Sequence, residues 1–401
     1  MKTFITAFVW TTLAAGQSSP DRIAGALQER VLSGQAARLK TDDRISLYNA
    51  MVQEKPENLH YQVLLAGAYI QKMRETTDFS YVDRASKVLD RVLAADSANY
   101  EALRLRTEVE LERHNFKRVV EYSMQLIGIG PQDPWNWGTM GDAYIEIGDY
   151  DKAADAYQKM MNLRPDLSSY NRAAHYRFLM NDMEGAIDIM KRAIDSGSTS
   201  PENIAWCWVE LGAYYLKSNR LGEAEHAYTN ALRTFPHYHP ALAGLGKVYT
   251  AQGKISEAIE SFTQAQAIVP LPDYSAALYD LYLRQGKQTE ANRQMATIDT
   301  IDKLAKANGE KVNRNLALIY ADHDHRVDRA LELAEAELDS RQDVYTYDAL
   351  AWALYKNGKY AEAAAAIDKA VRFHTPEPAF QVHAQKIHEA ALSARVAEET
   401  K

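Results

Sequence analysis

Residues 137–165 read WGTMGDAYIEIGDYDKAADAYQKMMNLRP, and the spacing of their apolar and small side chains decides the fold. Trp137, Met140 and Tyr144 are separated by three and four positions, so they share one face of a helix. The same spacing recurs from Ala153 to Met160. The stretch therefore predicts two amphipathic helices in succession.

The ends of these two helices are also visible in the sequence. Gly148 and Asp149 interrupt the chain between the helices, and Pro165 stops the second one because it has no N–H to donate. Gly141 is small enough to let the two backbones approach, and Tyr157 supplies bulk beside it. Such a hairpin exposes apolar surface that it cannot bury alone, so it predicts further copies on either side.

The order of Trp, a Met-Gly pair and Tyr, followed by Ala, Tyr and a closing Pro, resembles the tetratricopeptide repeat. Further copies are expected at 59–97, 100–133, 167–201, 205–238, 239–271, 272–306, 310–343 and 344–375. The resemblance implies an all-α fold, a right-handed superhelical solenoid of helical hairpins with a C-terminal capping helix.

The chain divides into four expected parts. Residues 1–16 are a predicted signal peptide, and 17–58 are cap helices that form a degenerate repeat. About nine repeats fill 59–375. Residues 376–401 are the capping helix and tail, whose apolar stripe from Phe380 to Ala394 should face the last repeat.

The first residues indicate export. Lys2 precedes a short apolar run that ends at Ala15, and small residues before Gln17 suit a cleavage site near that position. The run is too short for a stable membrane anchor, and no cysteine is placed to carry a lipid. The closing repeats, including DALAWALYKNGKY at 348–360, resemble those of exported bacterial tetratricopeptide proteins. We expect a periplasmic or secreted protein; a hydrophobic first helix is the alternative.

The composition argues against several kinds of partner and site. The net charge of -8 and the scattered Lys and Arg residues do not predict nucleic-acid binding. Cys207 is the single cysteine, so no intrachain disulfide can form. No nucleotide-binding, hydrolase or metalloprotease motif occurs, so the sequence predicts no enzyme and no cofactor.

Three short stretches could still carry chemistry. Asp322-His323-Asp324-His325 and His237-Tyr238-His239 contain residue types that bind metals, but each is expected to be a solvated turn. Cys207 is expected to be a buried thiol between two tryptophans. The prediction is therefore that the chain has no metal site.

The concave groove is the surface on which the resemblance implies binding of another protein or peptide. The groove positions on the first helix of each repeat are Trp135, Asp142, Asn171, His175, Phe178, Trp206, Val209, Lys247, Arg284, Arg314, Tyr345, Trp352 and Tyr355. The predicted function is a non-enzymatic scaffold that binds a peptide or helix of a partner. The alternatives are a metal-binding or catalytic site built on the repeats, or a self-associating structural subunit.

Overall fold

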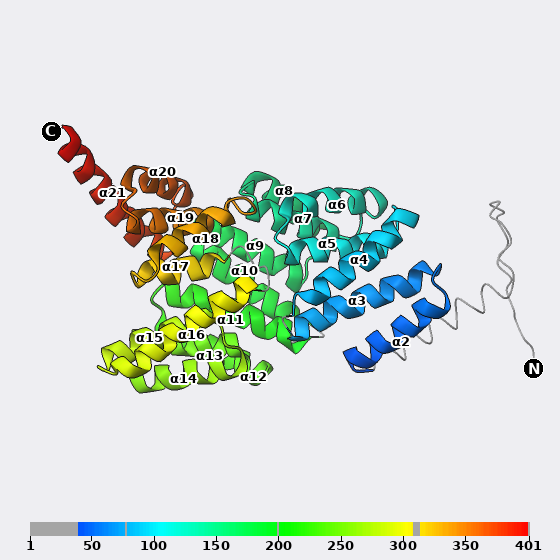
Figure 1. Ribbon diagram of the computed structural model, residues 1–401, viewed down its shortest axis with the longest axis horizontal. Coiled ribbons are helices and arrows are strands. Elements are labelled where there is room, and N and C mark those ends of the chain that lie inside the picture. The colour runs from blue at the N-terminus through cyan, green and yellow to red at the C-terminus, as the bar shows by residue number, and fades with distance from the viewer. Residues whose placement is uncertain (1–38, 77, 199, 308–312, 400–401) are drawn as a thin grey trace, which may run out of the picture. The chain divides into compact units, whose positions relative to one another are not determined.

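The computed structural model describes residues 39–76, 78–198, 200–307 and 313–399, and all of its regular elements are helices. The all-α prediction is confirmed for these residues. They fall into two compact units, one ending at Ser97 and one beginning at Ala98 (Figure 1). The predicted signal peptide and the start of the predicted N-terminal cap lie outside the described residues.

The described part of the N-terminal unit consists of helices α2 (Thr41–Glu54), α3 (Leu59–Thr76) and α4 (Ser80–Ala95). Helix α2 packs on α3, where Lys72 forms an ion pair with Asp42 at 2.8 Å and the Thr41 hydroxyl donates to Glu75 at 2.6 Å. Tyr48 is buried between them.

The C-terminal unit contains the remaining helices. They are α5 (Tyr100–Glu112), α6 (Phe116–Ile129), α7 (Pro134–Glu146), α8 (Tyr150–Leu163), α9 (Leu167–Leu179), α10 (Met183–Ser196), α11 (Pro201–Lys217), α12 (Leu221–Thr234), α13 (His239–Ala251), α14 (Ile255–Ile268), α15 (Pro272–Arg284), α16 (Gln288–Ala307), α17 (Arg314–Asp322), α18 (Val327–Glu337), α19 (Val344–Lys356), α20 (Tyr360–Ala370) and α21 (Pro378–Glu399). Consecutive helices pair as hairpins, as the repeat pattern predicts.

The hairpin of α7 and α8 shows how the sequence sets these boundaries. The Asp133 carboxylate accepts from the Trp135 backbone N–H and caps α7, and Pro134 occupies the first turn. Gly148 ends the hairpin turn with a φ of 80°. A Cβ at Gly141 would overlap the Tyr157 ring, which confirms that the small residue permits the close approach.

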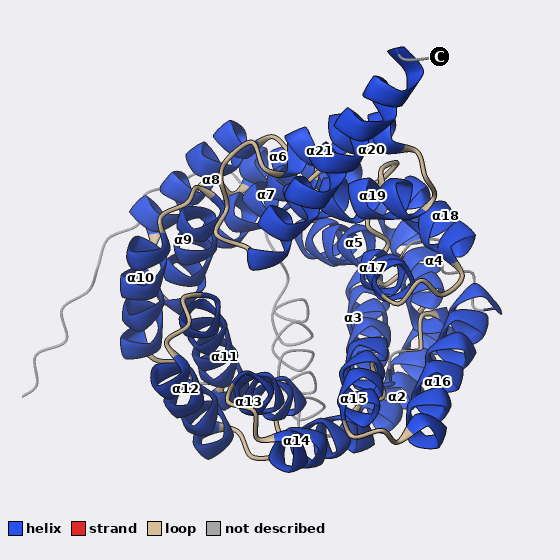
Figure 2. Cartoon of the chain, turned by 90° about the vertical axis from the view of Figure 1, so that its left-hand side faces the viewer, coloured by secondary structure: helices blue, strands red, loops and turns tan. Residues whose placement is uncertain are grey.

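The hairpins of the C-terminal unit are arranged in a turn. The first helix of each hairpin lies on the inside of the turn, and the second helix lies on the outside. Figure 2 shows α9, α11 and α13 on the inner side, with α10, α12 and α14 behind them. One buried hydrophobic cluster runs through α7 to α13, and another runs from α15 to α21. The inner helices therefore supply the concave surface, and the outer helices cover their backs.

The turn closes on itself through a contact that we call the seam, between the ends of α7 to α9 and the loops before α19 and after α20. The backbone N–H of Gln342 donates to the carbonyl of Glu146 at 2.7 Å. A Cβ at Gly148 would lie 2.5 Å from the Gln342 carbonyl oxygen. The backbones therefore touch at a position that glycine alone fits.

Side chains continue the seam along the same edge. The Tyr150 hydroxyl accepts from the Val344 N–H at 3.0 Å, and the Thr375 hydroxyl donates to the Leu179 carbonyl at 2.7 Å. Phe373 packs edge-on against Tyr150, with ring centroids 4.8 Å apart. The two hydrogen bonds join residues 194 and 196 positions apart in the chain, which no local pattern could have predicted.

Helix α21 caps the array with only part of its length. Phe380, His383 and Ile387 are buried against the preceding helices. Beyond Ile387 the helix projects from the body of the unit (Figure 1), and Leu392 is 65% exposed. The predicted contact stripe thus ends at Ile387 and does not reach Ala394, which is partly exposed.

Candidate binding site

A cavity of about 560 Å³ lies on the concave side of α7, α9 and α11. Its lining residues are Asp142, Tyr157, Leu167, Ser168, Asn171, Arg172, His175, Asn203, Trp206 and Glu210. Asn203, Trp206 and Glu210 on α11 are separated by three and four positions, and on α9 the pairs Leu167-Ser168 and Asn171-Arg172 recur four positions apart, so each set forms one helix face. The repeat geometry turns both faces toward the same space.

One side of the cavity is a preassembled polar cluster. The Arg172 guanidinium donates to both Asp142 carboxylate oxygens, at 2.8 Å from Nε and 2.7 Å from Nη2. The Tyr157 hydroxyl donates to the same carboxylate at 2.9 Å. Burial would lower the pKa of Arg172, but the Asp142 charge outweighs this and raises it. The cluster is rigid and carries no net charge.

The rest of the lining contains polar side chains that have no hydrogen-bond partner within the described part of the protein. Among the described residues, His175, Asn203, Trp206 and Glu210 form no hydrogen bond or ion pair. Burial and the nearby Lys217 charge lower the pKa of His175 to about 4, so its ring is neutral at pH 7. Burial raises the pKa of Glu210, although Lys217 and Lys247 oppose the shift. These groups could satisfy the donors and acceptors of a bound chain.

Four of the predicted groove residues, Asp142, Asn171, His175 and Trp206, line this cavity together. Two others are corrections. Phe178 is 1% exposed and stacks on Tyr214 in the core. Trp352 is 4% exposed because α21 covers it.

The remaining predicted residues lie elsewhere on the helices. Trp135 is half-buried beneath Arg104, and Val209 is half-buried against the core. Three residues contact other side chains: Tyr345 packs on Phe380, Tyr355 stacks on Trp352, and Arg314 pairs with Asp343. Lys247 and Arg284 are exposed. Arg314 and Tyr345 are thus engaged by the loop before α19 and by α21, and Tyr355 packs within its own hairpin.

Sequence reasoning missed Arg172, Glu210 and Asn203, and it assigned Tyr157 to packing alone. A signal for two of them was present, because Asn203 and Glu210 stand three before and four after Trp206 on the same helix. The role of Arg172 depends on its reach to Asp142, 30 positions away.

Comparison with known proteins identifies the repeats. Residues 136–167, 215–281 and 349–381 match family models of the tetratricopeptide repeat. The chain is a tetratricopeptide repeat protein. It is 29% identical over 161 residues to Superkiller complex protein 3 of Homo sapiens, which covers 39% of this chain and 10% of that protein.

Two further likenesses extend the comparison. Protein FlbA of Caulobacter vibrioides is 28% identical over 149 residues, which cover 37% of this tetratricopeptide chain and 23% of FlbA. The crystal structure of the APC/C hetero-tetramer Cut9-Hcn1 aligns with 87% of this chain and 67% of its own at 16% identity and a TM-score of 0.47. The chain thus spans less than a quarter of the length of both sequence relatives.

Each of the alternating Asp and His residues around the α17–α18 turn contacts a different neighbouring side chain of the repeat array. His323 contacts Asp280, His325 contacts Asp299, Asp322 accepts from the Trp352 indole, and Asp324 pairs with Lys356. The four side chains thus point to four different partners. Across the described residues, no group of three or more His, Cys, Asp or Glu side chains is placed to hold a metal ion.

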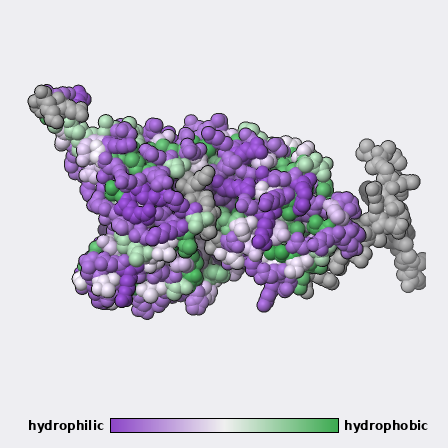
Figure 3. Space-filling model, viewed as in Figure 1, coloured by the Kyte–Doolittle hydropathy of each residue, from purple (hydrophilic) through white to green (hydrophobic). Residues whose placement is uncertain are grey.

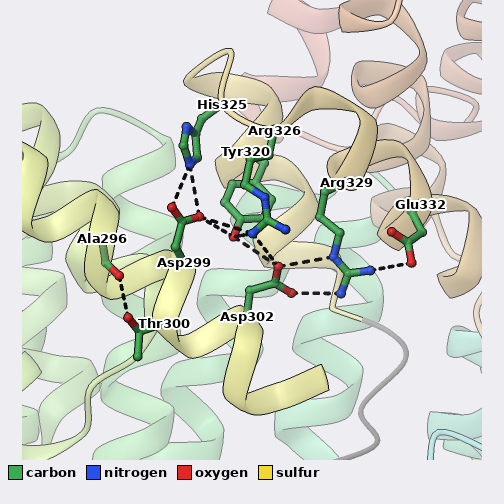
Figure 4. A network of polar contacts seen from close by, with 9 residues as sticks. All are labelled: Ala296, Asp299, Thr300, Asp302, Tyr320, His325, Arg326, Arg329 and Glu332. Carbon is green, nitrogen blue, oxygen red and sulfur yellow. Dashed lines mark hydrogen bonds and ion pairs between the residues drawn. The ribbon is translucent and has the colours of Figure 1, made fainter. Parts of the chain in front are cut away.

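A buried ion network joins this turn to α16. Figure 4 shows Asp302 between Arg326 and Arg329, at 2.8 and 2.9 Å, with the Tyr320 hydroxyl beside Asp299. Each carboxylate drawn there already binds a donor side chain of the same protein. The network holds tetratricopeptide hairpins together and offers no open site.

The other stretches that could carry chemistry are also engaged in the array. His239 shares a hydrogen bond of 2.7 Å with the Tyr274 hydroxyl. Cys207 is fully buried, and burial raises the pKa of its thiol to about 12. None of the described helices is long and apolar enough to span a membrane.

Proposed function

We propose that this tetratricopeptide protein is a non-enzymatic scaffold that binds an extended segment of another protein in the cavity of α7, α9 and α11. The observation that carries the proposal is the cavity lining, where Trp206 stands 39% exposed beside open hydrogen-bonding groups. Repeat proteins commonly use their concave surface for binding. An exposed tryptophan in a concave site is a typical binding anchor.

The size and closure of the site favour an extended segment over a folded domain. A volume of about 560 Å³ is that of a small-ligand pocket and holds only a few residues. The seam joins the array into a closed turn, which limits access to the inner surface. On the face shown in Figure 3, hydrophilic residues predominate and hydrophobic ones form separate patches. The outer surface in that view is therefore a weaker candidate for a binding face than the cavity.

The test uses a phage-displayed library of random nonapeptides selected on the full chain. We expect the wild type to enrich a common motif, and Trp206→Ala to weaken binding of the selected peptides by about 30-fold, as for a central aromatic anchor. Phe235→Ala is the control, because Phe235 is 38% exposed and lies outside the cavity. A library with no enriched peptide, or equal losses in both variants, contradicts the proposal.

We also propose that the protein is exported to the periplasm or beyond. The support is the charged and apolar start of the sequence, from Lys2 to Ala15. N-terminal sequencing of the protein isolated from its native cells tests this. A mature chain that begins near Gln17 is expected, and an intact Met1 contradicts export.

A further inference from the structure

Trp206 and Glu210 stand one helical turn apart on α11 and both face the cavity. Side chains four positions apart on a helix are neighbours on its surface. An aromatic face and a carboxylate are thus presented together to whatever occupies the cavity.

The Trp206 ring differs from the other tryptophans that the structure describes. Trp135 lies under the Arg104 guanidinium, and Trp137 donates its indole N–H to the Pro131 carbonyl. Trp208 packs on His226, and Trp352 is covered by rings on both sides. Among these five tryptophans, Trp206 alone has no ring contact, cation–π contact or hydrogen bond.

Glu210 is equally uncommitted. It is half-buried, and within the described part of the chain no donor reaches its carboxylate. Two cations act on this carboxylate electrostatically, but neither forms an ion pair with it. Lys217 pairs with Glu377 at 3.4 Å, and Lys247 is exposed. A partly desolvated carboxylate without a donor is stabilised by an incoming cation.

The charge of the whole lining points the same way. Asp142 and Arg172 neutralise each other, and the His175 ring is neutral. Two carboxylates against one guanidinium leave the lining residues with one net negative charge, which is located on Glu210, and Lys217 and Lys247 act on that charge from outside the lining. The cavity is therefore complementary to a positive group.

We propose that Trp206 and Glu210 form a slot for a basic side chain of the bound segment, arginine in preference to lysine. This inference rests on the proposed function. The cation would lie over the Trp206 ring and donate to the Glu210 carboxylate. A planar guanidinium can stack on the indole and bind the carboxylate with two donors, which an ammonium cannot. Asn171 and Asn203 stand beside the slot, where their amides can bind the backbone of the segment.

The experiment reads side-chain preference at each position of the bound peptide. A positional-scanning library of nonapeptides is titrated against the wild type, Glu210→Gln and Glu260→Gln, with folding checked by circular dichroism. Glu260 is a matched control, because it is an exposed carboxylate on the outer helix α14. Each variant removes one negative charge and keeps the shape of the side chain.

We expect the wild type to prefer arginine at one position by about tenfold over glutamine, the size of one charge-assisted contact. Glu210→Gln should still bind the same peptides but lose this preference, whereas Glu260→Gln should keep it. Raising the salt concentration should reduce the preference in the wild type.

Other outcomes separate the two proposals. Peptides that bind with no basic preference, or with an acidic preference, overturn the slot and leave the binding function standing. A basic preference that survives Glu210→Gln also overturns the slot. If the wild type binds no peptide in the library, both the slot and the binding function are contradicted.

Discussion

At the scale of single residues, identical side chains have opposite roles according to what covers them. Trp206 and Trp352 both lie on the first helix of a repeat, and both were predicted to line the groove. Trp206 is exposed in the cavity, whereas His383 of α21 stacks on Trp352 at 4.1 Å. The helical period places both residues correctly. It cannot show whether a segment 31 positions later folds back over one of them.

Cys207 gives a prediction at this scale. Its thiol is fully buried, and burial raises its pKa to about 12, so almost no thiolate exists at pH 8. We expect the thiol to react with Ellman's reagent at least about a thousandfold more slowly in the folded protein than in urea. Since it is the only cysteine, absorbance at pH 8 reports it directly. A rate in the folded protein close to the unfolded rate would show that α11 opens readily.

Two histidines predict how stability depends on pH. Burial, with nearby cations, lowers the pKa of both His114 and His175 to about 4. In the unfolded chain they titrate near 6.5, so between pH 6.5 and 4 the unfolded state binds more protons than the folded state. Their contribution to stability is present above pH 6.5 and is lost as the pH falls toward 4.

Urea unfolding at pH 7 and pH 5 measures this effect. We expect the free energy of unfolding to fall between these values by about 1–3 kcal/mol for the pair. His114→Gln and His175→Gln should each flatten the dependence, whereas the exposed His388→Gln should not. A slope unchanged in both variants would assign the acid sensitivity to other groups.

At the scale of elements, α16 shows where apolar periodicity reaches its limit. The pattern from Ala291 to Met295 places the helix in the hydrophobic cluster that it shares with α17 and α18, but the charged contacts near its end lie outside this pattern. Asp302 is 2% exposed and is held by Arg326 and Arg329 of the next hairpin. Charged residues on two separate segments form this contact, so no single-helix pattern predicts it.

Removal of the buried charge should weaken this junction. Burial opposes ionisation of Asp302, but the contacts with Arg329 and Arg326 outweigh it and lower the pKa of the carboxyl group. Asp302→Ala removes the buried acceptor that both arginines share, while Arg326 keeps Asp299 and Arg329 keeps Glu332, so we expect a loss of about 1.5–3 kcal/mol in the free energy of unfolding. Asp368→Ala, at an exposed ion pair, should cost less than about 1 kcal/mol by the same urea titration. Equal losses would show that the network adds nothing specific.

At the scale of the whole C-terminal unit, the seam decides whether the repeats form an open coil or a closed turn. The sequence pattern predicts the repeats between residues 100 and 375, because each hairpin needs contacts only with its neighbours. It does not predict the seam, since the seam joins segments almost 200 residues apart, where one backbone group pairs with another at Gln342 and two more pair with the hydroxyls of Tyr150 and Thr375. Only Gly148, with its left-handed φ and its close approach to Gln342, marks the seam at a single residue.

If the seam is one cooperative contact, loss of a bond at one end should loosen the other. Thr375→Val keeps the shape of the side chain but removes the hydroxyl that donates to Leu179. A buried hydrogen bond contributes about 1 kcal/mol, so the amide of Gln342, at the far end of the seam, should exchange with solvent about fivefold faster. Hydrogen-exchange mass spectrometry of the α18–α19 loop measures it.

The control is Thr250→Val, which removes a comparable hydroxyl contact within α13, away from the seam. It should leave exchange at Gln342 unchanged, because α13 does not contribute to the closing loops. Unchanged exchange in Thr375→Val as well would mean that the two loops are anchored independently. The turn could then open at one loop while the other stays closed, and access to the cavity would depend on the looser loop alone.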